Sequence, residues 1–324
     1  MKQPGDSRMY QILTDKEVEK YYNFSKIVSI YEKIFVEKNE GTYISPPRHS
    51  VKSEKGSLVF TIGGSSSEVE NAIGFRVYDT FPEIFGQKVE KPQLNVVFNN
   101  TSGELMGIII GNLIGPIRTA AINALAIKKM SNKNATTLGV IGTGNQARWH
   151  VEAVCAVRNV KQIKVFSRRP ELCEKFASSM SDRLKIETTA CSTSKQAVKD
   201  VDILLCLTTS RTPVFNSEDI SQGTHINTIG PKFVDAHEIP LDLIPKTKFI
   251  VTDSIEQTKS YSRSFFLTGT PTMDSIIELS DIVSEKVKLN RQTTDISLFS
   301  SVGLSGTEVV LSKFILQEFS KNKN

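Results

Sequence analysis

The chain has 324 residues, with 39% hydrophobic residues, 23% charged residues and a net charge of +5. This apolar fraction excludes a disordered protein, and the length fits about two domains that each bury a core. The mild positive charge includes no stripe of Lys and Arg interleaved with aromatic residues, so we expect no nucleic-acid partner.

The sequence contains no segment typical of secretion, membrane insertion or metal binding. The run MKQPGDSRMYQIL has no apolar core, so we expect no secretory signal. The longest apolar stretch, around Leu105 to Ile114, is short and interrupted by glycines, so we expect no membrane span. The four cysteines form no CxxC pair and have no histidine at metal-ligand spacing. We therefore expect a cytoplasmic protein with neither a metal site nor a disulfide framework.

The first third of the chain has the pattern of a mixed α+β unit. Apolar residues at helical spacing predict a helix over residues 15–35. Four β-like runs follow with turns and no helices between them, which favours an antiparallel sheet; they cover residues 57–62, 72–78, 93–98 and 104–110. Residues 118–130 then predict an Ala-rich helix.

The middle of the chain alternates short apolar runs with helical patterns. The runs cover residues 138–141, 163–166, 203–207, 226–229 and 249–251. Strands buried on both faces and separated by helices indicate a parallel, doubly wound sheet. A strand over 295–299 and a helix over 308–319 follow. We therefore expect an α/β fold, with a Rossmann domain over 131–300 and a discontinuous α+β domain over 1–130 together with 301–324.

A glycine motif follows the first of these apolar runs. Residues 142–147 have the pattern G-x-G-x-x-A, between a predicted strand and a helical pattern. Gly142 permits the tight turn, Gly144 lets the backbone approach a pyrophosphate, and Ala147 lets the helix pack close to the strand. The motif in this context predicts a dinucleotide site. The alternative is a structural glycine turn that binds nothing.

The end of the second strand indicates which dinucleotide is bound. An NAD site usually has an Asp or Glu there, about twenty residues past the motif, to hold the ribose 2′-hydroxyl. Here Ser167, Arg168 and Arg169 take that place. A hydroxyl and guanidinium groups suit a 2′-phosphate, with Arg168 favoured as the ligand. NADP(H) is therefore favoured over NAD(H), which stays possible.

Three arginines of the first domain stand in unusual surroundings. Arg76 lies inside an apolar strand, Arg118 opens the Ala-rich helix, and Arg48 follows two prolines. A buried arginine needs a partner, because an unpaired buried charge is costly. Converging arginines would hold a substrate carboxylate with bidentate geometry.

With these motifs, the sequence resembles the ornithine cyclodeaminase/mu-crystallin family over nearly the whole chain. The matching segments occur in the same order, at residues 46–48, 74–76, 118–121, 142–147, 225–230 and 301–304, with Glu238 and Arg291 also matching. The resemblance implies an NAD(P)-binding Rossmann domain and a substrate-binding and dimerisation domain, with the site between them. It also implies a homodimer that acts on a small amino acid, imine or 2-oxo acid with a carboxylate.

The resemblance assigns roles to residues of this chain. The residues that match Arg48, Arg76 and Arg118 bind the substrate carboxylate. Our own catalytic candidates are Arg76 and, as one of several possible proton sources, Lys232. The expected cofactor-binding residues are Thr119, Gly142, Thr143, Gly144, Asn145, Gln146, Ala147, Ser167, Arg168, Thr208, Thr209, Ile229, Val302 and Gly303.

Several positions depart from the family pattern. Arg76 stands where lysine is more typical, which keeps the charge but argues against an acid–base role. Gly115 stands at a threonine position. Lys232 stands where ornithine-cyclising members have an aspartate that contacts the distal amine, and Asp235 could replace that aspartate only in a rebuilt loop. Because a lysine repels an ammonium group, these changes favour imine reduction or reductive amination.

We therefore expect an NADPH-dependent imine (ketimine) reductase or amino-acid dehydrogenase. One alternative is an ornithine cyclodeaminase, which converts ornithine to proline and ammonia without net redox change. The other is a crystallin-like protein that binds NADPH or another ligand without catalysis. The proton source stays open among Lys232, Asp79, His237 and a bound water. We expect His225 to pack at a strand start.

Overall fold

The computed structural model describes residues 10–67, 70–82 and 91–322, and the chain forms two compact units. Unit 1 combines three segments of the chain. The first ends at Asn23, the second is Glu40–Arg118, and the third starts at Ser305. Unit 2 combines Phe24–Asn39 with Thr119–Leu304. The chain passes from unit 1 to unit 2 within helix α3 (Ile114–Met130).

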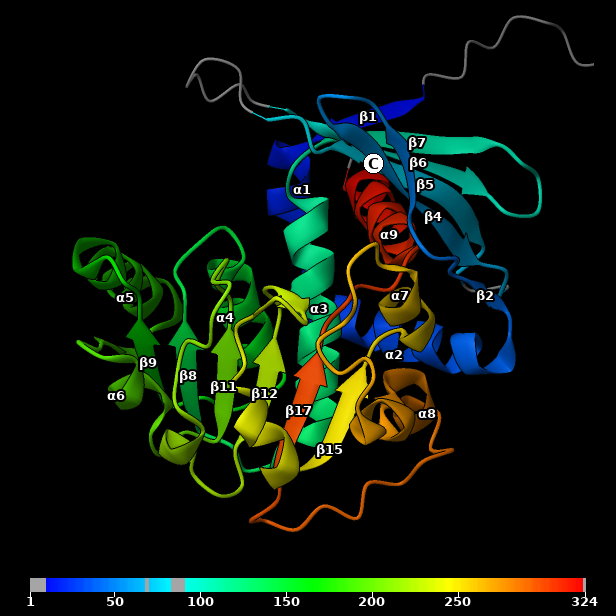
Figure 1. The fold of residues 1–324 in the computed structure, drawn as a ribbon. Coiled ribbons are helices and arrows are strands. Elements are labelled where there is room, and N and C mark those ends of the chain that lie inside the picture. The colour runs from blue at the N-terminus through cyan, green and yellow to red at the C-terminus, as the bar shows by residue number, and fades with distance from the viewer. Residues whose placement is uncertain (1–9, 68–69, 83–90, 323–324) are drawn as a thin grey trace, which may run out of the picture. The chain divides into compact units, whose positions relative to one another are not determined.

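A sheet of seven strands forms the centre of the described part of unit 1 (Figure 1). Its strands, in sheet order, are β1 (Gln11–Thr14), β7 (Leu105–Gly111), β6 (Gln93–Asn99), β5 (Ala72–Asp79), β4 (Ser57–Ser65) and β2 (Tyr43–Ile44), with β3 (His49–Lys52) beside β4. β1 pairs with β7 in parallel and the other pairs are antiparallel. The predicted antiparallel sheet is confirmed, with β1, β2 and β3 in addition.

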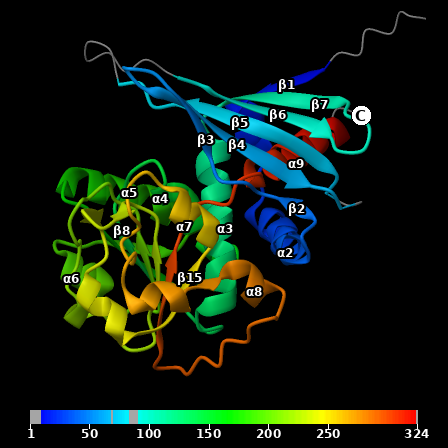
Figure 2. The ribbon, with the colours of Figure 1, turned by 45° about the vertical axis from the view of Figure 1, so that its right-hand side comes forward.

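Helices cover one face of this sheet. α9 (Thr307–Lys321) runs across β4, β5, β6 and β7 (Figure 2). α1 (Asp15–Tyr21) packs against α9. The prediction of one helix over residues 15–35 was wrong. The segment forms α1 and α2 (Phe24–Glu40), because Tyr22 has the extended dihedral angles φ −63° and ψ 144° and ends α1.

An all-parallel sheet of eight described strands forms the centre of unit 2. Its strands, in sheet order, are β10 (Glu187–Ala190), β9 (Gln162–Phe166), β8 (Thr137–Ile141), β11 (Ile203–Cys206), β12 (His225–Thr228), β17 (Ile296–Ser300), β15 (Thr247–Thr252) and β16 (Ile277–Glu278). The strand order reverses between β8 and β11, and such a switch point is where open α/β sheets bind ligands.

Both faces of this sheet are buried, which confirms the predicted doubly wound arrangement. β11 shows the pattern: Ile203 and Leu205 belong to one hydrophobic core, and Leu204 and Cys206 belong to the other. The first core includes residues from α3, α4 (Ala147–Cys155) and α5 (Pro170–Leu184).

The elements that cover the second core are shorter than the helices predicted between the strands of the middle of the chain. Helix α6 (Ser194–Val198), the 3-10 turn η2 (Leu241–Lys246) and the residues Phe215 and Ile220 on either side of the 3-10 turn η1 (Ser217–Asp219) contribute to it. The remaining described elements of unit 2 are the β13–β14 hairpin (Lys232–Phe233 and Ala236–His237), α7 (Ile255–Ser260), η3 (Pro271–Ser275) and α8 (Leu279–Val283).

The two compact units divide the chain after Arg118 and after Leu304, and they also place residues 24–39 in unit 2. The part of α3 after Arg118 packs into unit 2, where Ile127 belongs to the same core as Leu138 and Val140. Helix α2 also belongs to unit 2, and Lys38 near its end pairs with Glu278 at 2.6 Å. Both helices therefore contribute contacts to the Rossmann unit.

Candidate functional site

The glycine loop of unit 2 has the geometry that a bound pyrophosphate requires. Gly142 has φ +104°, and a Cβ on it would lie 2.6 Å from the carbonyl oxygen of Leu207. Its amide donates to the carbonyl of Phe166 at 2.9 Å. A Cβ on Gly144 would meet no atom within 4 Å, so this part of the loop is open to a ligand. Ala147 is fully buried at the start of α4, so the helix N-terminus lies close to the strand.

A cavity of about 620 Å³ adjoins this loop at the carboxyl ends of β8, β9 and β11. Eight of its lining residues bear on the predictions: Gly142, Thr143, Gly144, Ser167, Arg168, Arg169, Thr208 and Thr209. No Asp or Glu belongs to the described lining. The other expected cofactor residues, Thr119, Asn145, Gln146, Ala147, Ile229, Val302 and Gly303, do not line it. The cavity has the volume and the position of a dinucleotide site.

Glu238 holds the carboxyl ends of β11 and β12 together. Its fully buried carboxylate accepts five hydrogen bonds. Oε2 accepts from the amide and hydroxyl of Thr208 at 3.0 and 2.8 Å. Oε1 accepts from the hydroxyl of Thr228 at 2.8 Å and from the amides of Ile229 and Gly230 at 3.1 and 2.6 Å. One carboxylate thus orients Thr208 in the cavity wall and the segment that contains Ile229.

Asp253, which directly follows β15, has the same role for the end of β17. Its buried carboxylate accepts from the amides of Val302 and Gly303, each at 2.7 Å. Gly303 has φ +87°, and Tyr261 donates from its hydroxyl to the carbonyl of Val302 at 3.1 Å. We did not predict a role for Glu238 or Asp253. Their position one to ten residues past an apolar strand is the signal that could have identified them.

Polar side chains of α3 continue this network inside unit 2. Asn123 donates from Nδ2 to the carbonyl of Thr119 at 2.9 Å and to the hydroxyl of Ser301 at 3.2 Å. Asn227 donates to Oδ1 of Asn123 at 2.8 Å. Thr119 therefore lies on the same bonded network as the end of β17.

The hairpin after β12 positions Lys232 and Asp235 differently. Lys232 is only 9% exposed, and its Nζ donates to the carbonyl of Ile229 at 3.1 Å. Asp235 is exposed and forms ion pairs with Arg263 and Arg211. These two arginines lower the pKa of Asp235, with the Arg263 hydrogen bond as the main cause. The carboxylate of Asp235 is therefore held at the surface by cations, and Lys232 keeps the buried position.

The other titratable candidates are each bonded to a neighbour. His225 is fully buried beside Ser297, with a distance of 2.8 Å from Nδ1 to Oγ, as expected for a residue that packs at a strand start. Burial lowers its pKa to about 3, helped by the charge of Arg291. His237 bonds through Nδ1 to the carbonyl of Ile239 at 2.7 Å. Asp79, in unit 1, pairs with Lys91 at 3.1 Å.

Two of the three predicted arginines meet at a buried carboxylate in unit 1. Oε1 of Glu308 lies 3.1 Å from Nη1 of Arg76 and 3.2 Å from Nε of Arg118. Burial alone would raise the pKa of Glu308, but Arg118, Arg76 and Arg48 outweigh it, so the pKa lies below its ordinary value. Arg76 also donates from Nε to Gln93 at 2.8 Å.

This cluster of Arg48, Arg76, Arg118 and Glu308, the arginine cluster, has more positive than negative charge. Arg118 is 6% exposed, and neither its Nε nor its Nη1 makes a well-formed hydrogen bond in the structure. Buried guanidinium donors without acceptors are costly. The cluster therefore has capacity for an additional anion. Sequence reasoning missed Glu308, although its place in the first turn of the predicted last helix was visible.

The two departures from the family pattern at Arg76 and Gly115 depend on each other through the space that they share. A Cβ on Gly115 would lie 2.6 Å from Nη2 of Arg76. Any larger residue, including the threonine expected at this position, would occupy the space of the guanidinium. Gly115 therefore provides room for arginine where lysine is more typical.

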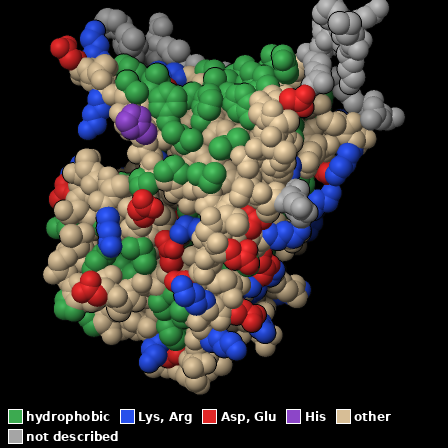
Figure 3. All heavy atoms as spheres, turned by 90° about the vertical axis from the view of Figure 1, so that its right-hand side faces the viewer, with side chains coloured by type: hydrophobic (Ala, Val, Ile, Leu, Met, Phe, Trp, Pro, Cys, Tyr) green, Lys and Arg blue, Asp and Glu red, His purple; other side chains and the backbone are tan. Residues whose placement is uncertain are grey.

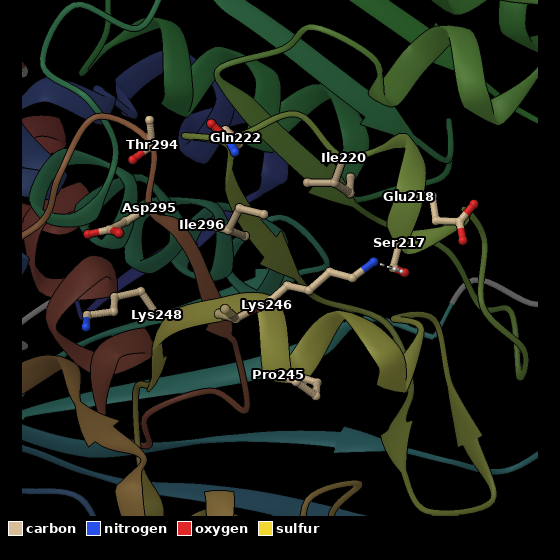
Figure 4. A pocket seen from close by; sticks show the side chains of 11 residues that line it. Ser217, Glu218, Ile220, Gln222, Pro245, Lys246, Lys248, Thr294, Asp295 and Ile296 are labelled. Carbon is tan, nitrogen blue, oxygen red and sulfur yellow. Dashed lines mark hydrogen bonds between the residues drawn. The ribbon is translucent and has the colours of Figure 1, made fainter.

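A second cavity of unit 2 lies at the opposite ends of the strands. It measures about 540 Å³ and is lined by residues before β12 and by residues before and at the start of β15 and β17 (Figure 4). There Lys246 donates to the hydroxyl of Ser217 at 3.0 Å, and that hydroxyl donates to Asp242. Parallel α/β sheets bind ligands at the carboxyl ends of their strands, which is where the cavity at the glycine loop lies.

Two further findings concern only the described residues. No three His, Cys, Asp or Glu side chains among them gather as a metal site requires. No described helix combines the length and the apolar character needed to cross a bilayer.

Comparisons with known proteins agree with the fold and the motifs. The Delta(1)-pyrroline-2-carboxylate reductase of Bacillus cereus is 26% identical over 317 residues, which cover 95% of this chain and 96% of that protein. The ketimine reductase mu-crystallin of Macropus fuliginosus is 28% identical and covers 96% and 98%. The structure of the Thermococcus litoralis Delta(1)-pyrroline-2-carboxylate reductase in complex with NADH and L-proline matches with a TM-score of 0.85 and 28% identity, over 96% and 98%.

The family model gives the same result over nearly the whole length. The model of the ornithine cyclodeaminase/mu-crystallin family matches residues 8–323. Together with the Rossmann unit, the glycine motif and the arginines described above, this match shows that the chain belongs to the ornithine cyclodeaminase/mu-crystallin family.

Proposed function

We propose that this protein is an NADP(H)-dependent reductase that converts a small α-imino acid to the corresponding amino acid. The substrate is a cyclic ketimine, or an imine formed from a 2-oxo acid and an amine. The arginine cluster carries the proposal, because its excess positive charge and Nη1 of Arg118, which makes no hydrogen bond, suit a carboxylate. The names of its relatives, pyrroline-2-carboxylate reductase and ketimine reductase, support the same chemistry.

The hairpin after β12 supports reduction over cyclodeamination. A diamine substrate needs an anion for its distal ammonium group. Lys232 occupies the buried position, and Asp235 is engaged by Arg263 and Arg211 at the surface. A crystallin-like protein without catalysis remains the non-enzymatic alternative, and the arginine cluster argues against it because such a protein needs no buried carboxylate site.

Each group has a defined task in the proposed reaction. When bound at the glycine loop, NADPH supplies a hydride for the imine carbon. Arg76, Arg118 and Arg48 hold the carboxylate and so orient the C=N bond. Glu308 keeps the two guanidinium groups of Arg76 and Arg118 in place. Lys232 is the proposed donor of the proton that the substrate nitrogen takes up, because the residue is only 9% exposed and its Nζ is oriented by the carbonyl of Ile229.

A substrate panel tests this function. Δ1-pyrroline-2-carboxylate, 2-oxo acids with ammonia or methylamine, and ornithine are each supplied with the cofactor, and absorbance at 340 nm and free ammonia are followed together. We expect NADPH oxidation with the cyclic imine and no ammonia from ornithine. Ammonia release from ornithine at constant absorbance would establish cyclodeamination instead, and inactivity on every compound would favour the non-enzymatic alternative.

Replacement of Arg118 by Ala tests the carboxylate site. We expect kcat/KM for the imine to fall by about 100-fold, because a charged hydrogen-bond partner is lost. The affinity for NADPH, measured by fluorescence, should stay within about twofold, because its site lies in the other unit. Arg118→Lys is the matched control and should retain part of the activity, since it keeps the charge without the forked geometry. Equal loss of cofactor affinity would show that Arg118 has another role.

We infer NADP(H) as the cofactor from the wall of the 620 Å³ cavity. Ser167, Arg168 and Arg169 line it, and its described lining has no carboxylate for a ribose 2′-hydroxyl. The double variant S167D/R168G should shift the ratio of kcat/KM values toward NADH by at least about tenfold. Arg169→Gly alone should shift it less, because Arg168 is the principal ligand proposed. An unchanged ratio in the double variant would contradict this assignment.

We propose further that the protein is a cytoplasmic homodimer. The four cysteines are free, as suits a reducing compartment. On the sheet face of unit 1 opposite α9, apolar side chains form a continuous surface, and Ile12, Leu58, Ile62 and Ile110 on it are 39% to 61% exposed. Figure 3 shows hydrophobic side chains gathered over this sheet. Apolar patches of this kind mark interaction sites.

Sedimentation of the Ile62→Asp variant tests the dimer. We expect the wild-type protein to have twice the mass of one chain and the variant to have the mass of a single chain, because a charge would be buried in the contact. Leu241→Asp, at another exposed apolar residue, is the matched control and should stay dimeric. A dimeric Ile62→Asp protein would exclude this face.

A further inference from the structure

The inner face of the sheet of unit 1 carries a row of buried polar side chains. Thr61, Arg76 and Asn95 lie opposite one another on β4, β5 and β6, on the side that α9 covers. Thr61 and Asn95 are each 1% exposed, and Oγ1 of Thr61 and Oδ1 of Asn95 have no hydrogen-bond partner in the structure. Buried polar atoms are almost always bonded, so this row needs hydrogen-bond partners, which a water or a ligand can supply.

The two oxygens of Glu308 differ in their surroundings. Oε1 lies within 3.2 Å of both Arg76 and Arg118. Oε2 is buried and has no hydrogen-bond partner. A carboxylate that only served to hold two guanidinium groups would use both oxygens, because each idle oxygen of a buried charge is costly. The arrangement leaves Oε2 of Glu308 and Nη1 of Arg118 without hydrogen bonds in the same cluster.

The arginine cluster therefore offers charges of both signs at one place. The guanidinium groups suit an anion, and Oε2 of Glu308 suits a cation with an N–H group. An α-amino acid or a protonated α-imino acid has such a pair of charges, since its nitrogen and its carboxylate are attached to the same carbon. A 2-oxo acid or a 2-hydroxy acid has only the carboxylate.

We propose that Oε2 of Glu308 binds the positively charged nitrogen of the substrate. The inference rests on the proposed function, because it adds the nitrogen to the carboxylate at the same site. Glu308 then has two tasks: Oε1 orients Arg76 and Arg118, and Oε2 selects α-imino and α-amino acids over acids without a basic nitrogen. The neutral acceptors of Thr61 and Asn95 extend the polar surface around it.

The binding of two matched acids tests this role without turnover. L-proline and (S)-tetrahydrofuran-2-carboxylate have the same ring size and the same carboxylate. They differ in one ring position, where proline has a charged NH₂⁺ group and the other acid has a neutral oxygen. Their Kd values are measured by titration calorimetry on the protein saturated with oxidised cofactor. The wild type should bind proline at least about tenfold more tightly, as one charged hydrogen bond provides.

In the Glu308→Gln variant, the ratio of the two Kd values should fall to about two or less, because the anionic acceptor is gone. The oxygen acid should bind as tightly as before or more tightly, since the remaining arginine charge is less neutralised. A purely structural Glu308 would predict the opposite, namely that both acids bind more weakly by the same factor. Glu308→Asp keeps the charge and should restore part of the preference.

Glu70 provides the matched control. It is a buried acid of the same unit that pairs with Lys313 at 3.4 Å. Glu70→Gln makes the same change of charge away from the arginine cluster and should leave the ratio unchanged. If Glu308→Gln does not fold, the Kd values of the wild type and of Glu308→Asp still test the role of Oε2. Similar affinity of the wild type for both acids would contradict this role of Glu308 but not the proposed function. If the wild type binds neither acid, the proposed function fails as well.

Discussion

The organisation of unit 1 depends on one buried interaction, the pair of ion pairs that Oε1 of Glu308 forms with Arg76 and Arg118. These residues come from α9, β5 and α3, which are far apart along the chain, and the carboxylate is fully buried. A buried charge is tolerated only with partners of opposite sign, so each of the three elements needs the other two. Gly115 contributes to the same arrangement, because a Cβ at this position would lie 2.6 Å from Nη2 of Arg76 and would compete with the guanidinium for space.

Unit 2 uses buried carboxylates in a different way. Glu238 and Asp253 accept hydrogen bonds from backbone amides at the ends of β11, β12 and β17. The carboxyl ends of parallel strands have amides and carbonyls that the sheet no longer pairs, and they are also where the ligands of such sheets bind. A buried acid therefore gives a defined conformation to segments that would otherwise be loose. In both units an acid orients the groups proposed to contact ligands.

Much of the fold was predictable because it depends on local patterns. The parallel sheet follows from short apolar runs such as 203–207, and the dinucleotide loop follows from Gly142, Gly144 and Ala147 next to a strand. The pairing of Glu308 with Arg76 was not predictable, because it joins residues 232 positions apart and nothing local distinguishes Glu308 from another acid in a first helical turn. The break between α1 and α2 was missed because the apolar spacing continues across Tyr22.

In the proposed reaction, a hydride from the nicotinamide is added to the carbon of a substrate C=N bond. The most direct measurement supplies the enzyme with Δ1-pyrroline-2-carboxylate and NADPH deuterated at the transferred position of C4, and determines the product by mass spectrometry and NMR. We expect proline with one deuterium on Cα and one oxidised cofactor for each proline formed. Proline formed without deuterium, or formed only from ornithine with no net oxidation of the cofactor, would contradict it.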